Sequence, residues 1–192
     1  MLFRSWEDPS NSKISKQAIY AFKGDVYSGL DAESIGEDKF DYLQNSLRII
    51  SGYYGLLRPF DQILPYRLEM GTKLENKNGN NLYKFWGDKI TDVLNEDLDT
   101  NDIIVNLASD EYFKSIVTKK LHNKIVTPQF KELKNGSYKT IAIYAKKARG
   151  LMSRFIIDNE IQNPNNLKNF NNEGYSFDSN LSDDFNYIFT RK

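Results

Sequence analysis

Hydrophobic side chains recur along two stretches of the chain at the spacing of an amphipathic helix. The first stretch is Glu37–Ser51 and the second is Leu82–Asp99. In both, every third or fourth residue is apolar, which places the apolar side chains on one face of a helix. The apolar positions are Phe40, Leu43, Leu47 and Ile50 in the first stretch, and Leu82, Phe85, Trp86, Ile90, Val93 and Leu94 in the second. Both stretches are therefore predicted to be helices with one buried side.

Shorter apolar runs, separated by turn residues, predict strands. The runs are Gln17–Phe22, Ile103–Leu107, Ile125–Leu133, Tyr138–Ala145 and Asn186–Thr190. Asn135-Gly136 predicts a tight hairpin between the third and fourth runs. Pro128 places the third run at a sheet edge, because proline cannot donate a hydrogen bond to a neighbouring strand. The first two runs are apolar enough to be interior strands, which need neighbours on both sides.

The segment ISGYYGLLRPFD, residues 50–61, predicts two short helices around a glycine-bounded turn. Such a helix-hairpin-helix element offers the N–H groups of its turn to a phosphate, and Arg58 is well placed to assist. The Gly-x-x-Gly spacing departs from the more usual Gly-x-Gly, and an ordinary helix–helix corner has the same pattern. From the residues alone, both interpretations stay open.

Polar side chains that suit acid–base or phosphate chemistry follow two of the predicted strands. Lys23-Gly24-Asp25 follows the first strand, and Ser109-Asp110-Glu111 follows the second. Open α/β sheets place their ligands at such strand ends. Each loop also has a plain structural interpretation: the first is a turn, and in the second Ser109 caps a helix whose first turn favours acids.

A third polar segment, residues 61–72, alternates apolar and charged side chains. Tyr66, Leu68 and Met70 alternate with Arg67 and Glu69, which predicts a short extended piece with its charges on one side. Arg67 and Glu69 also suit a surface ion pair, which contributes little. The three segments, together with Tyr144, supply a candidate catalytic set. Its members are Lys23, Asp25, Tyr66, Arg67, Glu69, Ser109, Glu111 and Tyr144.

Composition limits the chemistry that these residues can perform. The 192 residues suit one domain, and the 26 basic side chains are balanced by 26 acidic ones. There is no cysteine, which excludes disulfides and thiol peroxidase chemistry, and His122 is the only histidine, which excludes a multi-histidine metal site. No apolar run approaches the roughly 20 residues that span a bilayer. The first residues also lack the apolar core of a signal peptide, so a cytoplasmic location is expected.

The charges are nevertheless segregated along the chain. From Leu133 to Ile157 there are six basic residues and no acid. Residues 141–144 are predicted as a strand that runs directly into a helix, whose buried face is formed by Leu151, Met152, Phe155 and Ile156. A strand that delivers a basic helix start suits phosphate, because backbone N–H groups and cations converge there. A solvated helix face would have the same pattern. We expect Asp25, Glu69 and Lys146 to lie in one cleft.

Seven segments resemble the YaaA peroxide-stress protein family in order and spacing, from about Gln17 to the end of the chain. They are AFKGDVYSGL (21–30), ISGYYGLLRPFD (50–61), PYRLEMGTKLEN (65–76), LYKFWGD (82–88), NLASDEYFKS (106–115), YAKKARGLMSRFII (144–157) and NNEGYSFD (171–178). The resemblance implies a single mixed α/β domain over residues 1–192. Its expected features are a central mixed sheet, surrounding helices, a positively charged cleft and a helix-hairpin-helix-like element.

The chain departs from the family at its start. Family members usually carry several dozen further residues there, including a first strand and a Ser-Pro-Ala-Lys segment. The chain therefore looks like an amino-terminally truncated member without the first strand region. A missing strand would expose a sheet edge, which predicts self-association through that edge.

The resemblance also implies a function. The family is associated with DNA binding and with protection against hydrogen peroxide, linked to keeping free intracellular iron low. The expected partner is double-stranded DNA, held by its phosphates without sequence specificity. The residues expected to bind it are Arg58, Lys146, Lys147, Arg149 and Arg154. No cofactor, metal site or settled reaction comes with the resemblance. The alternative is an enzyme acting on a nucleotide-like or phosphate-containing substrate in a polar cleft.

Overall fold

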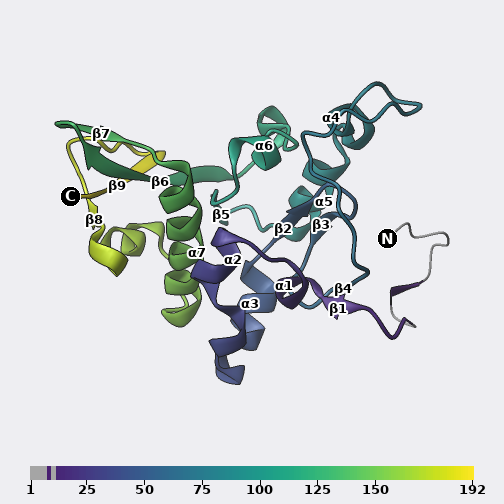
Figure 1. The fold of residues 1–192 in the computed structure, drawn as a ribbon, viewed down its shortest axis with the longest axis horizontal. Coiled ribbons are helices and arrows are strands. Elements are labelled where there is room, and N and C mark those ends of the chain that lie inside the picture. Colours follow the sequence, from purple (N-terminus) through teal and green to yellow (C-terminus); the bar gives the residue numbers. More distant parts are fainter. Residues whose placement is uncertain (1–7, 10–11) are drawn as a thin grey trace.

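A five-stranded mixed sheet forms the carboxyl-terminal part of the fold (Figure 1). The computed structural model describes residues 8–9 and 12–192. The strands of the sheet are β5 (Ile103–Val105), β6 (Lys124–Lys134), β7 (Ser137–Lys139), β8 (Ser176–Phe177) and β9 (Asn186–Arg191). Their order is β5-β6-β9-β8, with β7 paired to β6. The first three strands of this order are parallel, whereas β7 and β8 pair antiparallel to their neighbours. The mixed sheet expected from the sequence is confirmed.

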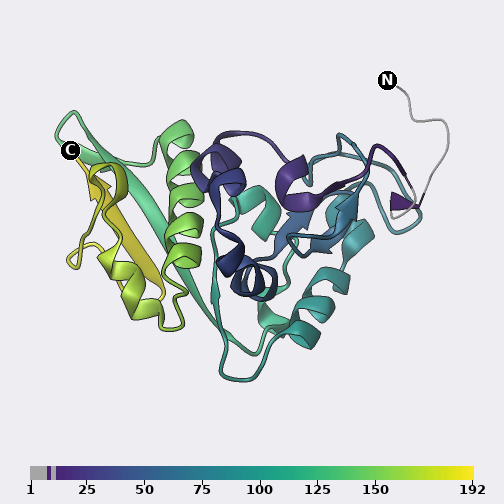
Figure 2. The same ribbon diagram turned by 90° about the horizontal axis from the view of Figure 1, so that it is seen from below.

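The long helix α7 (Ala142–Asp158) covers one face of this sheet and lies between β7 and β8 in the chain, within the crossover from β6 to the parallel strand β9. Figure 2 shows α7 lying along the sheet, between the strands and the amino-terminal elements. Ala145, Ala148 and Met152 pack against Phe130 and Phe189 of the two central strands. The predicted inner face of the helix is confirmed, since its other three members also pack against this cluster; they are Leu151, Phe155 and Ile156.

Short helices and two small antiparallel sheets precede the large sheet. The helical elements are α1 (Ala18–Ala21), α2 (Asp25–Leu30), η2 (Ala32–Ser34), η3 (Glu37–Lys39), α3 (Phe40–Ser46), α4 (Leu82–Trp86) and α5 (Lys89–Asp97). The strands are β1 (Lys16–Gln17), β2 (Ile49–Ser51), β3 (Gly55–Leu57) and β4 (Gln62–Ile63), which pair as β1-β4 and β2-β3. Later connections contain α6 (Asp110–Phe113), η4 (Thr118–Lys120), η5 (Pro164–Asn169) and η6 (Asn172–Gly174). Within the described part of the chain, no helix is both long and apolar enough to cross a membrane.

Several predicted elements are confirmed. The Asn135-Gly136 turn joins β6 to β7, and both residues have the positive φ that a two-residue hairpin turn requires. The predicted helix over residues 82–99 forms as α4 and α5, divided at Gly87, where φ is 51°. The closing strand forms as β9. Between residues 66 and 70, the apolar side chains are turned inward and the charged ones outward, as the alternation predicts.

Two strand predictions are wrong because helices form instead. Residues 18–21 form α1, whose first N–H groups donate to carbonyls of a distant loop: Ala18 to Asp61 and Ile19 to Pro59. The strand predicted over residues 138–145 ends at Lys139, and residues 142–144 are the first turn of α7. The alternation of Ile141 and Ile143 is a local coincidence, since the spacing of the buried alanines continues a helical period.

The helix-hairpin-helix prediction for residues 50–61 is also wrong. The segment contains an antiparallel β-hairpin, in which Ile49 pairs with Leu57 and Ser51 with Gly55. Gly55 has a φ of 79°, and the ring of Trp86 lies where a side chain would stand. The helix predicted over residues 37–51 accordingly ends at Ser46, before the first strand of this hairpin.

Strand positions in the large sheet also differ from those predicted. β6 is central, although it contains Pro128. Thr127 donates its N–H toward β9, so the nitrogen of Pro128 faces the other side, where β5 pairs only with residues 124–126 and β7 only with residues 132–134. β5, predicted as interior, stands at one end of the strand order, and Ile103 is 37% exposed.

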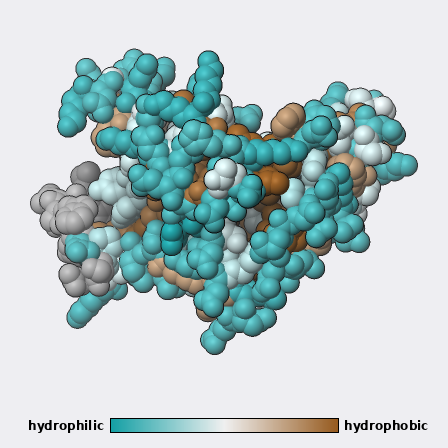
Figure 3. Space-filling view, turned by 180° about the vertical axis from the view of Figure 1, so that it is seen from behind, coloured by the Kyte–Doolittle hydropathy of each residue, from teal (hydrophilic) through white to brown (hydrophobic). Residues whose placement is uncertain are grey.

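Figure 3 shows that apolar residues gather around a hollowed area in the middle of the face opposite to Figure 1. Self-association through an exposed edge stays a prediction.

A close crossing of α2 and α7 joins the amino-terminal elements to the sheet layer. Gly29 and Gly150 lie at this crossing, where a Cβ on Gly29 would clash with the Lys147 carbonyl and one on Gly150 with the Val26 carbonyl. Backbone can approach backbone this closely only where both helices lack a side chain.

We expect Gly150→Ala to lower the free energy of unfolding by about 1–3 kcal/mol, because the added methyl group forces the helices apart. In an uncrowded helix the same change would raise stability by about 0.5–1 kcal/mol. Urea unfolding of both proteins measures the difference, with the exposed α7 change Ile143→Ala as the control. An unchanged or higher stability of Gly150→Ala would show that the crossing does not depend on glycine.

Candidate functional site

Two of the arginines predicted to bind DNA are engaged within the protein. Arg154 donates to the Asp158 carboxylate at 2.7 Å and to the Ser34 hydroxyl at 2.6 Å, and it also bonds the carbonyls of Asp31 and Ser34. Arg58 donates to Asp97 at 2.7 Å. These bonds give both arginines a structural role: Arg154 fixes η2 against α7, and Arg58 ties the end of β3 to α5.

Asp97 accepts from a second arginine as well. Arg48 reaches its other oxygen at 2.7 Å and also donates to three backbone carbonyls. Burial favours the neutral carboxyl, but hydrogen bonds from Arg48 and Arg58 outweigh this effect and hold the pKa of Asp97 below its ordinary value. The two arginines and Asp97 therefore form an ion network that connects the hairpin region to α5.

Lys147 and Tyr144 belong to a second network, at the start of α7. Lys147 pairs with Glu173 at 2.5 Å. Arg191 of β9 donates to Glu132 at 2.8 Å and lies over the ring of Tyr144, 5.0 Å from its centroid. The hydroxyl of Tyr175 donates to the same glutamate. Tyr144, a candidate catalytic residue, thus stands beside an ion network of the sheet, and its grouping with the three polar segments stays a prediction.

The two remaining predicted cations, Lys146 and Arg149, differ in burial. Burial lowers the pKa of Arg149, although the nearby Asp110 opposes this effect. Its guanidinium reaches the Ala108 carbonyl at 3.5 Å, and its buried Nε has no partner among the described residues. Lys146 is exposed, and no ion pair or hydrogen bond links it to the rest of the described chain.

Two further lysines near the start of α7 are exposed in the same way. Lys134 ends β6 and Lys139 ends β7, three residues before α7 begins, and neither side chain pairs with an acid in the described residues. With Lys146 they form what we call the hairpin lysine group: Lys134, Lys139 and Lys146. Lys134 and Lys139 were not among the residues predicted to bind DNA, although both belong to the acid-free basic run from Leu133 to Ile157.

Tyrosines from three elements form a second candidate feature, the tyrosine cluster Tyr27, Tyr66 and Tyr112. Phe22 stacks on Tyr27 with ring centroids 5.5 Å apart and meets Tyr66 edge-on at 6.0 Å. Tyr66 shares a 2.6 Å hydrogen bond with the buried Ser51. Burial, and then the neighbouring phenols of Tyr66 and Tyr112, raise the pKa of Tyr27 above the ordinary value of a phenol, which is already protonated at neutral pH.

The other candidate catalytic residues are only partly gathered around this cluster. Glu69 lies near Tyr112, whose pKa is raised by burial and then by Tyr66, Glu111 and Glu69. Glu111 of α6 accepts a hydrogen bond from the Gly71 N–H at 2.8 Å, and this bond holds the loop that contains Gly71 against α6. Ser109 occupies the predicted cap position, but its hydroxyl makes no cap bond to the described residues. Arg67 and Asp25 are exposed. That Asp25, Glu69 and Lys146 line one cleft stays a prediction.

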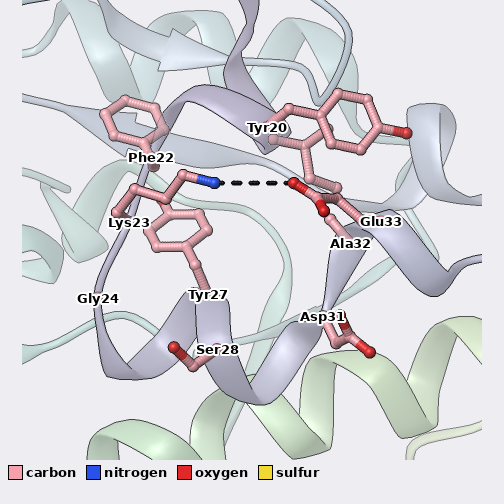
Figure 4. A pocket seen from close by; sticks show the side chains of 10 residues that line it. Tyr20, Phe22, Lys23, Gly24, Tyr27, Ser28, Asp31, Ala32 and Glu33 are labelled. Carbon is pink, nitrogen blue, oxygen red and sulfur yellow. Dashed lines mark ion pairs between the residues drawn. The ribbon is translucent and has the colours of Figure 1, made fainter.

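Tyr27 also lines a small hollow between α1, α2 and η2 (Figure 4). Its volume is about 190 Å³. Lys23 and Glu33 reach toward each other across it, with 3.9 Å between Nζ and Oε1. Lys23 was predicted from the sequence as a candidate, whereas Tyr20, Tyr27 and Glu33 were not, since nothing in their spacing marks them as neighbours.

These features define the chain first as a mixed α/β protein, in which a crossover helix carries a partly neutralised basic surface. The chain belongs to the family of the peroxide stress protein YaaA, whose profile matches residues 2–181. It is also similar to the UPF0246 protein of Hahella chejuensis, with 50% identity over 191 residues, which are 98% of this chain and 75% of the relative. The resemblance found in the sequence is thus confirmed, and the chain is related to peroxide stress.

The Arg48–Asp97–Arg58 network gives stability a defined pH dependence. A carboxyl whose pKa is lowered by folding adds stability above its unfolded pKa, near 3.8, and loses it as the pH falls through the folded value. We expect Asp97→Asn to lower the free energy of unfolding by about 1–3 kcal/mol at pH 7. The deficit relative to the unaltered chain should shrink below about pH 4.

Urea unfolding from pH 7 to pH 3 measures this deficit, and the exposed change Asp184→Asn is the matched control. A deficit that stays constant down to pH 3 would contradict the ionic origin of the effect.

Proposed function

We propose that the chain serves the peroxide-stress response by binding the phosphates of double-stranded DNA through the hairpin lysine group. The supporting observation is that these three lysines are exposed and lack acidic partners in the described structure, whereas Arg58, Lys147 and Arg154 have such partners. Arg149, more deeply buried, backs this surface from the same helix. Free lysines are suited to phosphate because their charge is not already neutralised.

The start of α7 strengthens this surface. The helix has 17 residues, and no side chain among the described residues caps its first N–H groups. Unpaired N–H groups at a helix start carry partial positive charge, which adds to that of the lysines. None of these groups reads the edge of a paired base, so the expected binding to duplex DNA is independent of sequence.

The same contacts offer a physical link to iron. Cations condense on the DNA backbone, and a protein that neutralises phosphates releases them. Ferrous ions held there would turn peroxide into radicals next to the DNA. A chain bound to the phosphates would therefore keep ferrous ions away from the DNA backbone. This effect would add to the limitation of free intracellular iron with which the family is associated.

A second candidate function is an enzyme acting on a phosphate-containing substrate. The observation that favours it is the tyrosine cluster, where three phenols and Ser51 meet beside Glu69. Phenols that keep their protons can donate to a substrate oxygen and serve as acids. The proposal of an enzyme needs these hydroxyls, whereas the proposal of DNA binding does not.

We expect DNA affinity to fall with rising salt, because binding releases counterions. For duplex DNA the slope of log affinity against log salt should be about −0.9 for each phosphate neutralised. Replacing Lys134, Lys139 and Lys146 together by alanine should make the slope shallower by up to about 2.7. Fluorescence anisotropy of a labelled duplex over a salt series measures both slopes.

The matched control replaces Lys73, Lys77 and Lys119, which are also exposed and lack described partners. It removes the same net charge at other places and should leave the slope almost unchanged. Equal effects of the two triple variants would mean that only net charge matters, and the hairpin lysine group would then not be the interface.

The enzyme hypothesis predicts that Tyr66→Phe lowers turnover of a nucleotide substrate by about 10²-fold or more. The change removes one hydroxyl and keeps the ring that packs beside Phe22. Phosphate release from nucleoside mono-, di- and triphosphates is the measurement, with Tyr138→Phe as a matched loss of a hydroxyl elsewhere. Absence of turnover by the unaltered chain, or equal turnover by both variants, would remove this second candidate.

A further inference from the structure

The hollow between α1, α2 and η2 has an aromatic wall that is held in place. Phe22 stacks on Tyr27 with an angle of 22° between their planes, so Tyr27 cannot turn away on that side. Figure 4 shows the rings of Tyr20, Phe22 and Tyr27 around the hollow. A flat aromatic face of this kind binds nucleobases by stacking, because every base has a π-face.

The rim of the hollow carries one carboxylate and one ammonium group that are nearly free. The side chains of Lys23 and Glu33 are 75% and 80% exposed, and they stand 3.9 Å apart. A pair this exposed contributes little to stability and separates easily. Asp31 also lines the hollow, but its carboxylate already accepts from the Ser34 hydroxyl at 2.6 Å. Glu33 is therefore the acceptor available to a ligand, and Lys23 is the donor.

The backbone around these groups is fixed. Arg154 of α7 bonds the Ser34 hydroxyl and the carbonyls of Asp31 and Ser34, on both sides of Glu33. On the opposite rim Gly24 has a φ of 123°, and no atom of the described residues lies within 4 Å of the place where its side chain would be. The hollow is thus held from α7 and left open at Gly24.

We propose that this hollow binds a guanine base. Guanine presents two adjacent donors, N1–H and the N2 amino group, which suit the Glu33 carboxylate. Its acceptors O6 and N7 suit the ammonium group of Lys23. Adenine presents an acceptor where guanine has N1–H, and this acceptor would face the carboxylate. The base stacks on the aromatic wall while these two side chains read its edge.

The size of the hollow also favours a single base. Its volume of about 190 Å³ is below the range of roughly 300–1,000 Å³ that is typical of sites for whole drug-sized ligands. The sugar and phosphate would stay outside, so a free guanine nucleotide and an unstacked guanine in single-stranded DNA present the same chemistry. This inference does not depend on duplex binding by the hairpin lysine group.

Calorimetric titration of the full chain with GMP, IMP and AMP tests the proposal. GMP should bind most tightly, with IMP roughly 10-fold weaker because it lacks the N2 amino group, and AMP weaker still. Glu33→Gln and Lys23→Ala should each weaken GMP binding roughly 10-fold and remove the preference over AMP. The exposed changes Glu75→Gln and Lys77→Ala are the matched controls and should leave GMP binding unchanged.

A second titration separates the two sources of the base. It uses a thymine oligonucleotide that carries one guanine, compared with the same strand carrying inosine. Guanine-dependent binding of the oligonucleotide with no binding of GMP supports a base held from DNA, and binding of both supports the free nucleotide as well. Equal affinities for GMP and AMP, GMP binding that survives both variants, or no binding of any guanine ligand would each overturn the proposal. The variant that lacks the three lysines of the hairpin lysine group should still bind GMP. Failure of the proposal of duplex binding can therefore be distinguished from failure of the proposal of guanine binding.

Discussion

The close crossing of α2 and α7 is the constraint on which the other features depend. Gly29 and Gly150 let the two backbones meet, and this contact sets the distance between the sheet layer and the amino-terminal elements. One turn beyond Gly150, Arg154 bonds the backbone of η2 and so fixes the rim of the hollow. Tyr27, within α2, lines the hollow, and its hydroxyl lies close enough to those of Tyr66 and Tyr112 for them to raise its pKa. A shift at the crossing would therefore move the hollow and the tyrosine cluster together.

A basic stretch in the sequence is not the same as a basic surface. Arg154 and Lys147 of α7 are paired with Asp158 and Glu173, and Arg58 is paired with Asp97. These acids lie from four to thirty-nine residues away from their partners, so only the fold brings most of them together. Within the acid-free run from Leu133 to Ile157, the lysines left without an acidic partner in the described structure are Lys134, Lys139 and Lys146. An exposed ion pair contributes little to stability, but it removes two charges from any interface that needs them.

Local signals predicted the local features. The Asn135-Gly136 turn, the inner face of α7 and the alternation between residues 66 and 70 each depend on the conformational preferences of a few adjacent residues. The errors fall where distant partners decide. Residues 18–21 become a helix whose N–H groups bond a loop about forty residues away, and the turn at Gly55 is set by packing under Trp86. The same holds for the candidate site. The sequence indicated the basic region. The ion pair of Arg58 with Asp97, the bonds from Arg154 to η2 and the aromatic walls of the hollow depend on tertiary contacts that residue spacing does not reveal.

The geometry of α7 relates the two proposed surfaces to each other. Arg154 bonds the rim of the hollow, and Lys146 stands eight residues earlier on the same helix. At 1.5 Å per residue, these positions are about 12 Å apart along the helix axis. In duplex DNA successive nucleotides of one strand rise about 3.4 Å, so this separation corresponds to a few nucleotides. Along α7, the residue that fixes the rim of the hollow is therefore separated from Lys146, the helical member of the hairpin lysine group, by a length comparable to a few nucleotides of a strand. Because α7 is a single helix held by the sheet on one side and by α2 on the other, that separation is fixed before any ligand binds.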